Sequence, residues 1–183
     1  MALAQKNIRF LKDRDVQRIV TLCPHCFNTL KNEYPALGGV FQVFHAVQYV
    51  HKLIEERRIR LKYPVNRNMA LHDPCYLGRA NQIYEPLRRI GAAVPGLEMK
   101  ELPRHHAKSF CCGGGGGRMW LHEDIGDHIS HLRAKEVLGT GVALLGTACP
   151  YCMIMLDDGL KNLEAEHAPE VRDIIEIVAD SMA

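Results

Sequence analysis

Five cysteines in the second part of the chain have the residue type and the spacing of a metal site. Cys75 is followed after 35 residues by the adjacent pair Cys111 and Cys112, and after a further 36 residues by Cys149 and Cys152. A zinc ion takes four ligands in a closed tetrahedron, and two neighbouring residues rarely both reach one small ion without strain. An iron–sulfur cluster offers several metal atoms, so Cys111 and Cys112 can bind different irons. The spacing therefore favours a multi-iron redox site.

An unbroken run of glycines from Gly113 to Gly117 follows the cysteine pair. Because glycine has no side chain, the backbone at Gly113 and Gly114 can approach a cluster closely and donate N–H hydrogen bonds to its sulfides, which helps to set its potential. A phosphate-binding loop is the rival interpretation. A Walker motif ends in Gly-Lys-Ser/Thr, however, and this run ends in Arg118, so the nucleotide interpretation is the weaker one.

Imidazole and cationic side chains near the cysteines are candidates for residues that contact the cofactor or its cysteine ligands without binding the metal themselves. His72 stands immediately before Asp73-Pro74-Cys75, and His105-His106 stand shortly before the cysteine pair. Arg118 could offset the negative charge of a cluster, with a solvated surface position as the alternative. The same two interpretations apply to the other nearby cations, Arg79, Arg104 and Lys108.

Composition sets the class of protein. Net charge is +2, with 23 Lys and Arg against 21 Asp and Glu, so no basic excess indicates nucleic-acid binding. No apolar run reaches the roughly 18 residues of a membrane span. The first residues, Met1–Ala4, lead into Gln5 without the apolar core of a signal peptide. Seven cysteines without a secretion signal predict a reducing, cytoplasmic compartment in which thiols stay free.

A second Cys-Pro-x-Cys motif near the amino terminus matches the one at the end of the site. Cys23 and Cys26 lie in the pattern Thr-x-Cys-Pro-x-Cys, as do Cys149 and Cys152, and in each copy a leucine stands four residues after the second cysteine. The first copy has no upstream cysteine and no Cys-Cys-Gly. We therefore expect that the first repeat began before Met1, and that Cys23 and Cys26 are two ligands of an incomplete site.

The coarse pattern is an α/β alternation. Short apolar runs of the length of buried parallel strands each precede a cysteine, and they span 18–22, 69–71 and 142–145. Amphipathic stretches from Val43 to Ile54 and from Val171 to Val178 predict helices. Ligands of parallel sheets bind at the carboxyl ends of strands, where these cysteines would lie. Turn-forming residues from Pro64 to Asn68 predict a boundary near residue 65.

The residues around the cysteines resemble a known family. Two sequence motifs are similar to those of the cysteine-rich CCG domain. They are His72-Asp73-Pro74-Cys75-Tyr76-Leu77-Gly78-Arg79 and Ser109-Phe110-Cys111-Cys112-Gly113. This domain occurs in heterodisulfide reductases, in iron-sulfur subunits of glycolate and lactate oxidation systems, and in bacterial electron-transfer-flavoprotein:quinone reductases. The segment from Cys26 to Pro35, with His45 downstream, is most similar to the last group.

The resemblance implies a Rossmann-like parallel-sheet fold with a complete second CCG domain in residues 66–183. Residues 1–65 would be the carboxyl-terminal part of a similar preceding domain. It also implies a [4Fe-4S] cluster, noncubane in the heterodisulfide reductase example, held by the five cysteines of the second domain. Zinc, reported in one CCG domain of other members, is the alternative metal.

The implied function is that of an electron-transfer module in a larger oxidoreductase. Electrons would pass between a flavoprotein or hydroxy-acid oxidase and a quinone or disulfide acceptor, with other subunits or domains of a redox complex as partners. Some family members have an amino-terminal membrane region, which would place the protein at the inner face of the cytoplasmic membrane. The alternatives are a zinc-stabilised structural domain, a cluster-free thiol–disulfide protein, and a scaffold with a vestigial site.

Overall fold

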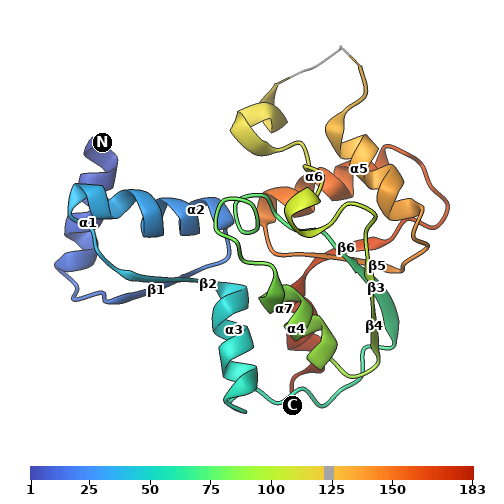
Figure 1. Ribbon diagram of the computed structural model, residues 1–183, viewed down its shortest axis with the longest axis horizontal. Helices are drawn as coiled ribbons and strands as arrows, with labels where there is room; N and C mark the ends of the chain where they lie inside the picture. Colours follow the sequence, from blue (N-terminus) through green and yellow to red (C-terminus); the bar gives the residue numbers. More distant parts are fainter. Residues whose placement is uncertain (122–125) are drawn as a thin grey trace.

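The computed structural model describes residues 1–121 and 126–183. Its central feature is a four-stranded parallel sheet with the strand order β4-β3-β5-β6 (Figure 1). In chain order this is a doubly wound arrangement, because the chain turns to one side of β3 first and to the other side afterwards. The predicted α/β class with a Rossmann-like parallel sheet is confirmed. The strands are β3 Arg67–Leu71, β4 Leu97–Glu101, β5 Leu144–Thr147 and β6 Glu170–Asp173.

Helices cover both faces of this sheet, and alternating side chains of β3 show which helices cover which face. Met69 and Leu71 belong to one buried cluster together with residues of α3, α4 and α7, whereas Ala70 belongs to a second cluster with residues of α5 and α6. Burial of both faces explains why the apolar runs of the two central strands, β3 and β5, do not alternate with polar residues. The helices are α3 Ala46–Glu55, α4 Glu85–Ala93, α5 Ile129–Leu138, α6 Pro150–Lys161 and α7 Ile174–Ser181.

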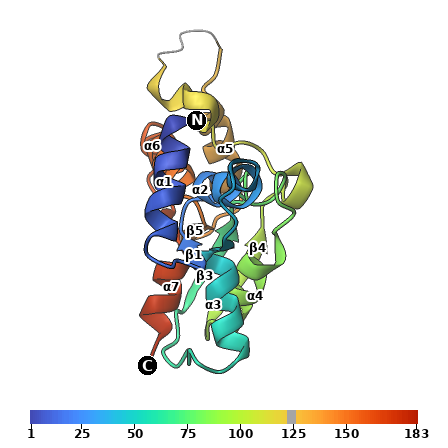
Figure 2. The same ribbon diagram turned by 90° about the vertical axis from the view of Figure 1, so that its left-hand side faces the viewer.

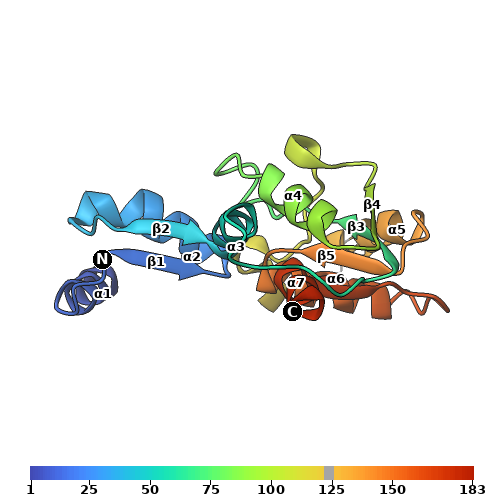
Figure 3. The ribbon, with the colours of Figure 1, turned by 90° about the horizontal axis from the view of Figure 1, so that it is seen from below.

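A separate pair of parallel strands lies on the amino-terminal side. β1 Arg18–Thr21 pairs with β2 Gln42–His45, and Figures 1 and 3 both show this pair projecting to one side of the four-stranded sheet. Helix α1 spans Ala2–Lys12 and the short α2 spans Pro24–Asn28. Apart from two short helical segments after α2, Thr29–Glu33 and Tyr34–Leu37, the element order β1-α2-β2-α3 recurs as β5-α6-β6-α7. The likeness between the two Cys-Pro-x-Cys segments thus extends to the flanking strands and helices.

Two predicted helices begin later than their apolar patterns indicate. Val43 lies in β2 opposite Ile19 of β1, and α3 begins only after His45, which caps it. Val171 likewise lies in β6, and α7 begins after the capping residue Asp173. In both cases an apolar strand continues into an amphipathic helix without a loop, so the two periodicities merge in the sequence.

The segments on either side of residue 65 share one core. Val47 of α3 is fully buried in the cluster that also contains Leu87 of α4 and Ile177 of α7. The backbone N–H of Lys62 donates to the carbonyl of Ser181 at 2.7 Å. The division into 1–65 and 66–183 therefore stays a prediction.

The chain ends lie far apart along the molecule. Figure 2, which looks onto α1, shows the amino terminus near one end and the carboxyl terminus at the other. None of the helices within residues 1–121 and 126–183 combines the length and the apolar content that crossing a lipid bilayer requires.

Candidate metal centre

The loops that carry the cysteines leave the carboxyl ends of neighbouring strands. Cys75 follows β3 and Cys149 follows β5, and these strands pair directly, with Met69 opposite Leu144. The strand order reverses between β3 and β5, which is where doubly wound sheets bind their ligands. Cys149 is the N-cap of α6 and Pro150 occupies the first helical turn, where its fixed φ suits the helix. The fold thus directs two of the three cysteine segments to one crevice.

The five cysteine side chains form a continuous chain of contacts. Hydrogen bonds link the thiol of Cys75 to Cys111, Cys111 to Cys112, Cys112 to Cys152, and Cys152 to Cys149. All five are free cysteines, and the last three in the sequence are buried. The structure therefore brings together every cysteine of the predicted second site.

These contacts divide the thiols into two kinds. The thiols of Cys112 and Cys75 donate to Cys111 and lower its pKa, and the thiol of Cys152 lowers the pKa of Cys149 in the same way. Donating these hydrogen bonds, together with burial, raises the pKa of each of the three donor thiols. The pKa of Cys112 rises to about 11, and those of Cys75 and Cys152 rise as well. Cys111 and Cys149 are therefore the thiols that lose their protons most readily. Because thiolates are the metal ligands, metal binding releases the protons of the thiols that coordinate it.

Four of the five cysteines, Cys75, Cys112, Cys149 and Cys152, line a small cavity of about 10 Å³ together with three aromatic rings. The ring of His25 lies 4.3 Å from that of Tyr76 and 5.4 Å from that of Tyr151, measured between centroids. Cys23 and Cys26, on either side of His25, do not line this cavity, and Cys26 is exposed. The structure thus leaves the first cysteine pair outside the five-cysteine cluster. The lining residues are Pro24, His25, Pro74, Cys75, Tyr76, Cys112, Gly115, Cys149, Tyr151 and Cys152.

The glycine run brings backbone N–H groups against the cysteine sulfurs. The N–H of Gly113 donates to Cys111 Sγ at 3.3 Å, and the N–H of Gly114 donates to Cys112. Gly113 has a φ of +92°, which favours glycine, and a Cβ on Gly114 would meet Met155 Cγ at 2.9 Å. Arg118 is exposed and lines a separate hollow next to Gly113 and Met155.

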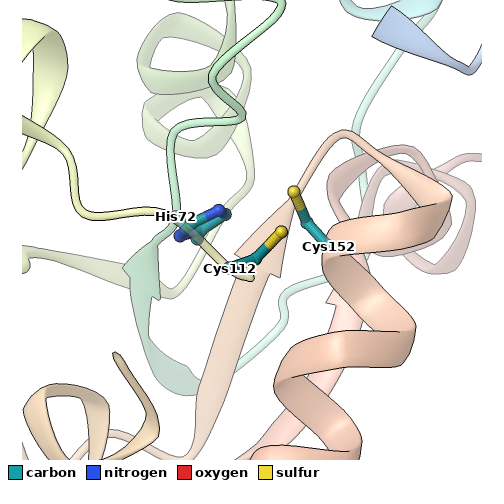
Figure 4. A group of neighbouring side chains, drawn as sticks. All are labelled: His72, Cys112 and Cys152. Carbon is teal, nitrogen blue, oxygen red and sulfur yellow. The ribbon is translucent and has the colours of Figure 1, made fainter. Parts of the chain in front are cut away.

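His72 lies directly behind the cysteines. Its side chain is buried, and a ring nitrogen lies within 4.8 Å of the sulfur atoms of Cys112 and Cys152, as Figure 4 shows. Its Nδ1 accepts a hydrogen bond from Nε of the buried Arg133 at 3.3 Å. Burial, followed by the charge of Arg133, lowers the pKa of His72 to about 3, so the ring is neutral.

Asp73 joins the loop of Cys75 to the loop that leads into the cysteine pair. Both of its carboxylate oxygens accept from Arg88, at 2.8 and 3.0 Å, and Oδ2 also accepts from the backbone N–H of His106 at 2.7 Å. Burial raises the pKa of Asp73, but these hydrogen bonds outweigh it and hold the pKa below its usual value. His106 therefore contacts Asp73 through its backbone, while the ring of His105 lies near Glu101.

Two arginines of this site carry no sequence signal. Arg88 comes from α4 and Arg133 from α5, and neither lies in a recognisable motif. Only the chain topology places them beside His72 and Asp73.

His45 connects the two Cys-Pro-x-Cys loops. Its Nε2 donates to the carbonyl of Leu22 at 2.9 Å and also bonds the carbonyl of Ala148, the residues just before Cys23 and Cys149. Its Nδ1 accepts from the N–H of Val47 and caps α3. Burial lowers the pKa of His45 to about 4.

The donor set fits an iron–sulfur cluster better than a single closed zinc ion. Zinc needs four ligands, whereas five cysteines with an adjacent pair are linked here, four of them lining the cavity and Cys111 joined to Cys75 and Cys112. Backbone N–H groups at the sulfurs and a buried imidazole beside them are the contacts that stabilise such an anionic centre.

Comparison with known proteins agrees with this geometry. The family model of the CCG cysteine-rich domain matches residues 1–31 and 69–157. The chain is 39% identical over 180 residues to the "Probable iron-sulfur-binding oxidoreductase FadF" of Bacillus subtilis, covering 98% of this chain and 26% of that protein. It is 35% identical over 187 residues to the "EtfAB:quinone oxidoreductase" of Syntrophomonas wolfei, with coverages of 98% and 26%.

A third relative comes from Methanosarcina barkeri. It is a subunit of the dihydromethanophenazine:CoB--CoM heterodisulfide reductase, and it is 32% identical over 183 residues, with coverages of 98% and 44%. The chain thus spans about a quarter of the length of the two bacterial relatives. The matched residues include all five clustered cysteines as well as Cys23 and Cys26. The chain belongs to the CCG cysteine-rich domain family.

Proposed function

We propose that this chain is an iron–sulfur electron-transfer module of a larger oxidoreductase. The observation that carries the proposal is that five cysteines from three distant segments are linked by side-chain contacts at the switch point of the sheet. Cys75, Cys111, Cys112, Cys149 and Cys152 would hold the cluster. The names of the relatives, which describe iron–sulfur-binding and quinone- or disulfide-reducing proteins, support the same conclusion.

The cluster type that we propose is the one the family resemblance implies, a [4Fe-4S] centre that is noncubane in the heterodisulfide reductase example. Cys111 and Cys112 are adjacent, so their sulfurs are best used on different irons. When bound, the centre accepts and passes on one electron at a time. The chain contributes the thiols of Cys111 and Cys149, whose pKa values are lowered, the N–H groups of Gly113 and Gly114, and the aromatic rings of His25 and Tyr76 beside the cavity.

Electron donor and acceptor would be bound by other parts of the complex. We propose a flavoprotein or a hydroxy-acid oxidase as donor and a quinone or disulfide as acceptor, because the relatives' names include an EtfAB:quinone oxidoreductase and a heterodisulfide reductase. A reduced flavin gives up its two electrons in two single steps, which matches a one-electron carrier. The place of action would be the cytoplasm, at the inner face of the membrane where a membrane-bound partner is present.

The domain organisation is part of the same proposal. Residues 66–183 would form a complete CCG domain, and residues 1–65 the carboxyl-terminal part of another. Two separate matches to the family model and the recurring order of strands and helices support this division. Cys23 and Cys26 would then be the last two ligands of a first site.

Anaerobic reconstitution with iron and sulfide tests the proposal. We expect broad charge-transfer absorbance, several irons per chain and a paramagnetic signal in one redox state. One tightly bound zinc without iron would show a structural zinc domain instead. A reversible disulfide without any metal would show a thiol–disulfide protein.

A further inference from the structure

Arg133 is a charged side chain buried without contact to solvent. It lies in α5 with 0% of its surface exposed. Nε donates to His72 Nδ1 at 3.3 Å, and one terminal nitrogen donates to the carbonyl of Arg104 at 3.0 Å and to the carboxylate of Glu136. The other terminal nitrogen has no hydrogen-bond partner among the described residues. Burial of a guanidinium is costly, so a role for it is expected.

The contact with Arg133 fixes where the hydrogen of the His72 ring sits. A guanidinium has only donors, so the nitrogen that faces it, Nδ1, must be an acceptor without hydrogen. The single ring hydrogen of a neutral imidazole is then on Nε2. Figure 4 shows one ring nitrogen of His72 on the side of the sulfur atoms of Cys112 and Cys152 and the other on the opposite side. With Nδ1 held by Arg133, Nε2 is the nitrogen left to donate to sulfur.

Arg133 belongs to a group of balanced ion pairs. Glu136 accepts from both Arg133 and Arg104, and Arg88 is shared between Asp73 and Glu101, so the arginines and the carboxylates of the group are equal in number. Within this group, Arg133 is the cation that contacts His72. An electron added to an anionic centre is stabilised by a positive charge held nearby.

We propose that Arg133 is a positioning residue that holds His72 with its Nε2–H directed at the sulfur atoms of the cluster. The inference rests on the proposed function and deepens it. Through this hydrogen bond and its own charge, Arg133 raises the reduction potential of the centre. Metal ligation itself is left to the cysteines.

A pair of variants separates the hydrogen bond from the charge. Arg133→Met removes the charge and the donor to His72, whereas Arg104→Met removes a cation from the same Glu136 carboxylate without touching His72. In redox titrations of the reconstituted protein we expect a clearly lower midpoint potential for Arg133→Met and a smaller shift for Arg104→Met. Arg133→Lys should restore part of the potential by restoring the charge. Equal shifts in both Met variants, or none, would overturn the inference.

A second pair of variants acts on His72 itself. The amide N–H of Gln reaches the place of Nε2, whereas the amide oxygen of Asn takes the place of Nδ1 and leaves no donor toward sulfur. We expect His72→Gln to keep more of the wild-type potential than His72→Asn. The reverse order would contradict the proposed hydrogen bond.

A measurement on the unaltered protein covers the case in which these buried variants do not fold. In the paramagnetic state of protein labelled with ¹⁵N-histidine, electron–nuclear double resonance should detect one exchangeable proton and one histidine nitrogen coupled to the iron spins. Absence of both couplings in cluster-loaded protein would overturn this inference alone. Failure of the wild-type chain to load iron at all would overturn the proposed function instead.

Discussion

The sulfur atoms of Cys112 and Cys26 differ in their surroundings, although each cysteine belongs to a motif. Cys112 is buried and contacts two other cysteines of the cluster, whereas Cys26 is exposed and contacts only Cys23 among the cysteines. We predict that Cys112→Ser removes most of the bound iron, because an adjacent pair that bridges different irons cannot lose one member without loss of the centre. Iron and sulfide per chain after anaerobic reconstitution measure this.

The matched control is Cys26→Ser, which should leave the iron content of the five-cysteine site unchanged. Unaltered iron in the Cys112→Ser protein would count against its assignment as a ligand.

Residue spacing alone predicts the members of the cysteine cluster but not the residues around it. Five thiols and the glycine run stand in short motifs, and the structure brings the thiols together. Arg88 and Arg133 act at the same place, but each comes from a helix distant in the sequence. Contacts of that kind are set by the topology of the fold, and a single sequence holds no local signal for them.

At the level of elements, the close contact between α5 and α6 depends on Gly159. A Cβ at this position would lie 2.8 Å from the backbone oxygen of Ser130, which cannot move without shifting α5. Alanine gains at most about 1 kcal/mol in helix propensity, whereas overpacking costs about 1–3 kcal/mol. We therefore predict that Gly159→Ala lowers the free energy of unfolding by about 1–2 kcal/mol, as measured by urea denaturation.

Gly91 of α4 provides the comparison, because the same substitution there meets only the flexible end of the Met99 side chain, with Sδ at 2.6 Å. Gly91→Ala should cost less than Gly159→Ala. A stabilising effect of Gly159→Ala would show that α5 can move away from α6 at little cost.

The sequence alone predicts the strands that have clear apolar runs, whereas it does not predict β2, β4 and β6. β4 is an edge strand with mostly exposed side chains, so its sequence lacks an apolar run. β2 and β6 pass directly into helices at His45 and Asp173, so one apolar pattern covers two elements. The side-chain caps that divide them are visible only in the folded chain.

At the scale of the whole molecule, His45 couples folding to pH. Its pKa is about 4 in the folded protein against 6.5 in the reference state. Between these values the unfolded chain binds more protons, so the contribution of His45 is fully present above about pH 6.5 and is lost as the pH falls toward 4. The loss amounts to roughly 3 kcal/mol at most. His72, with its lowered pKa, adds a loss in the same direction.

We predict that His45→Asn reduces the acid sensitivity of the metal-free, reduced protein. Asparagine can still cap α3 but does not titrate. The free energy of unfolding, measured by urea denaturation between about pH 7 and pH 4, should fall less steeply than in the wild type. His167→Asn, at an exposed position, should leave the slope unchanged. If the free energy of unfolding of His45→Asn fell with pH as steeply as that of the wild type, His45 would not be buried in its neutral form.

The three aromatic rings at the cavity have a consequence for survival in air. His25, Tyr76 and Tyr151 line the cavity together with four of the cysteines, and His25 comes from α2 rather than from the segments that carry the five clustered cysteines. Dioxygen and peroxide attack thiolates and clusters that they can reach. We therefore expect the lifetime of a bound centre in aerated buffer to depend on how firmly His45 holds the segment around His25 in place.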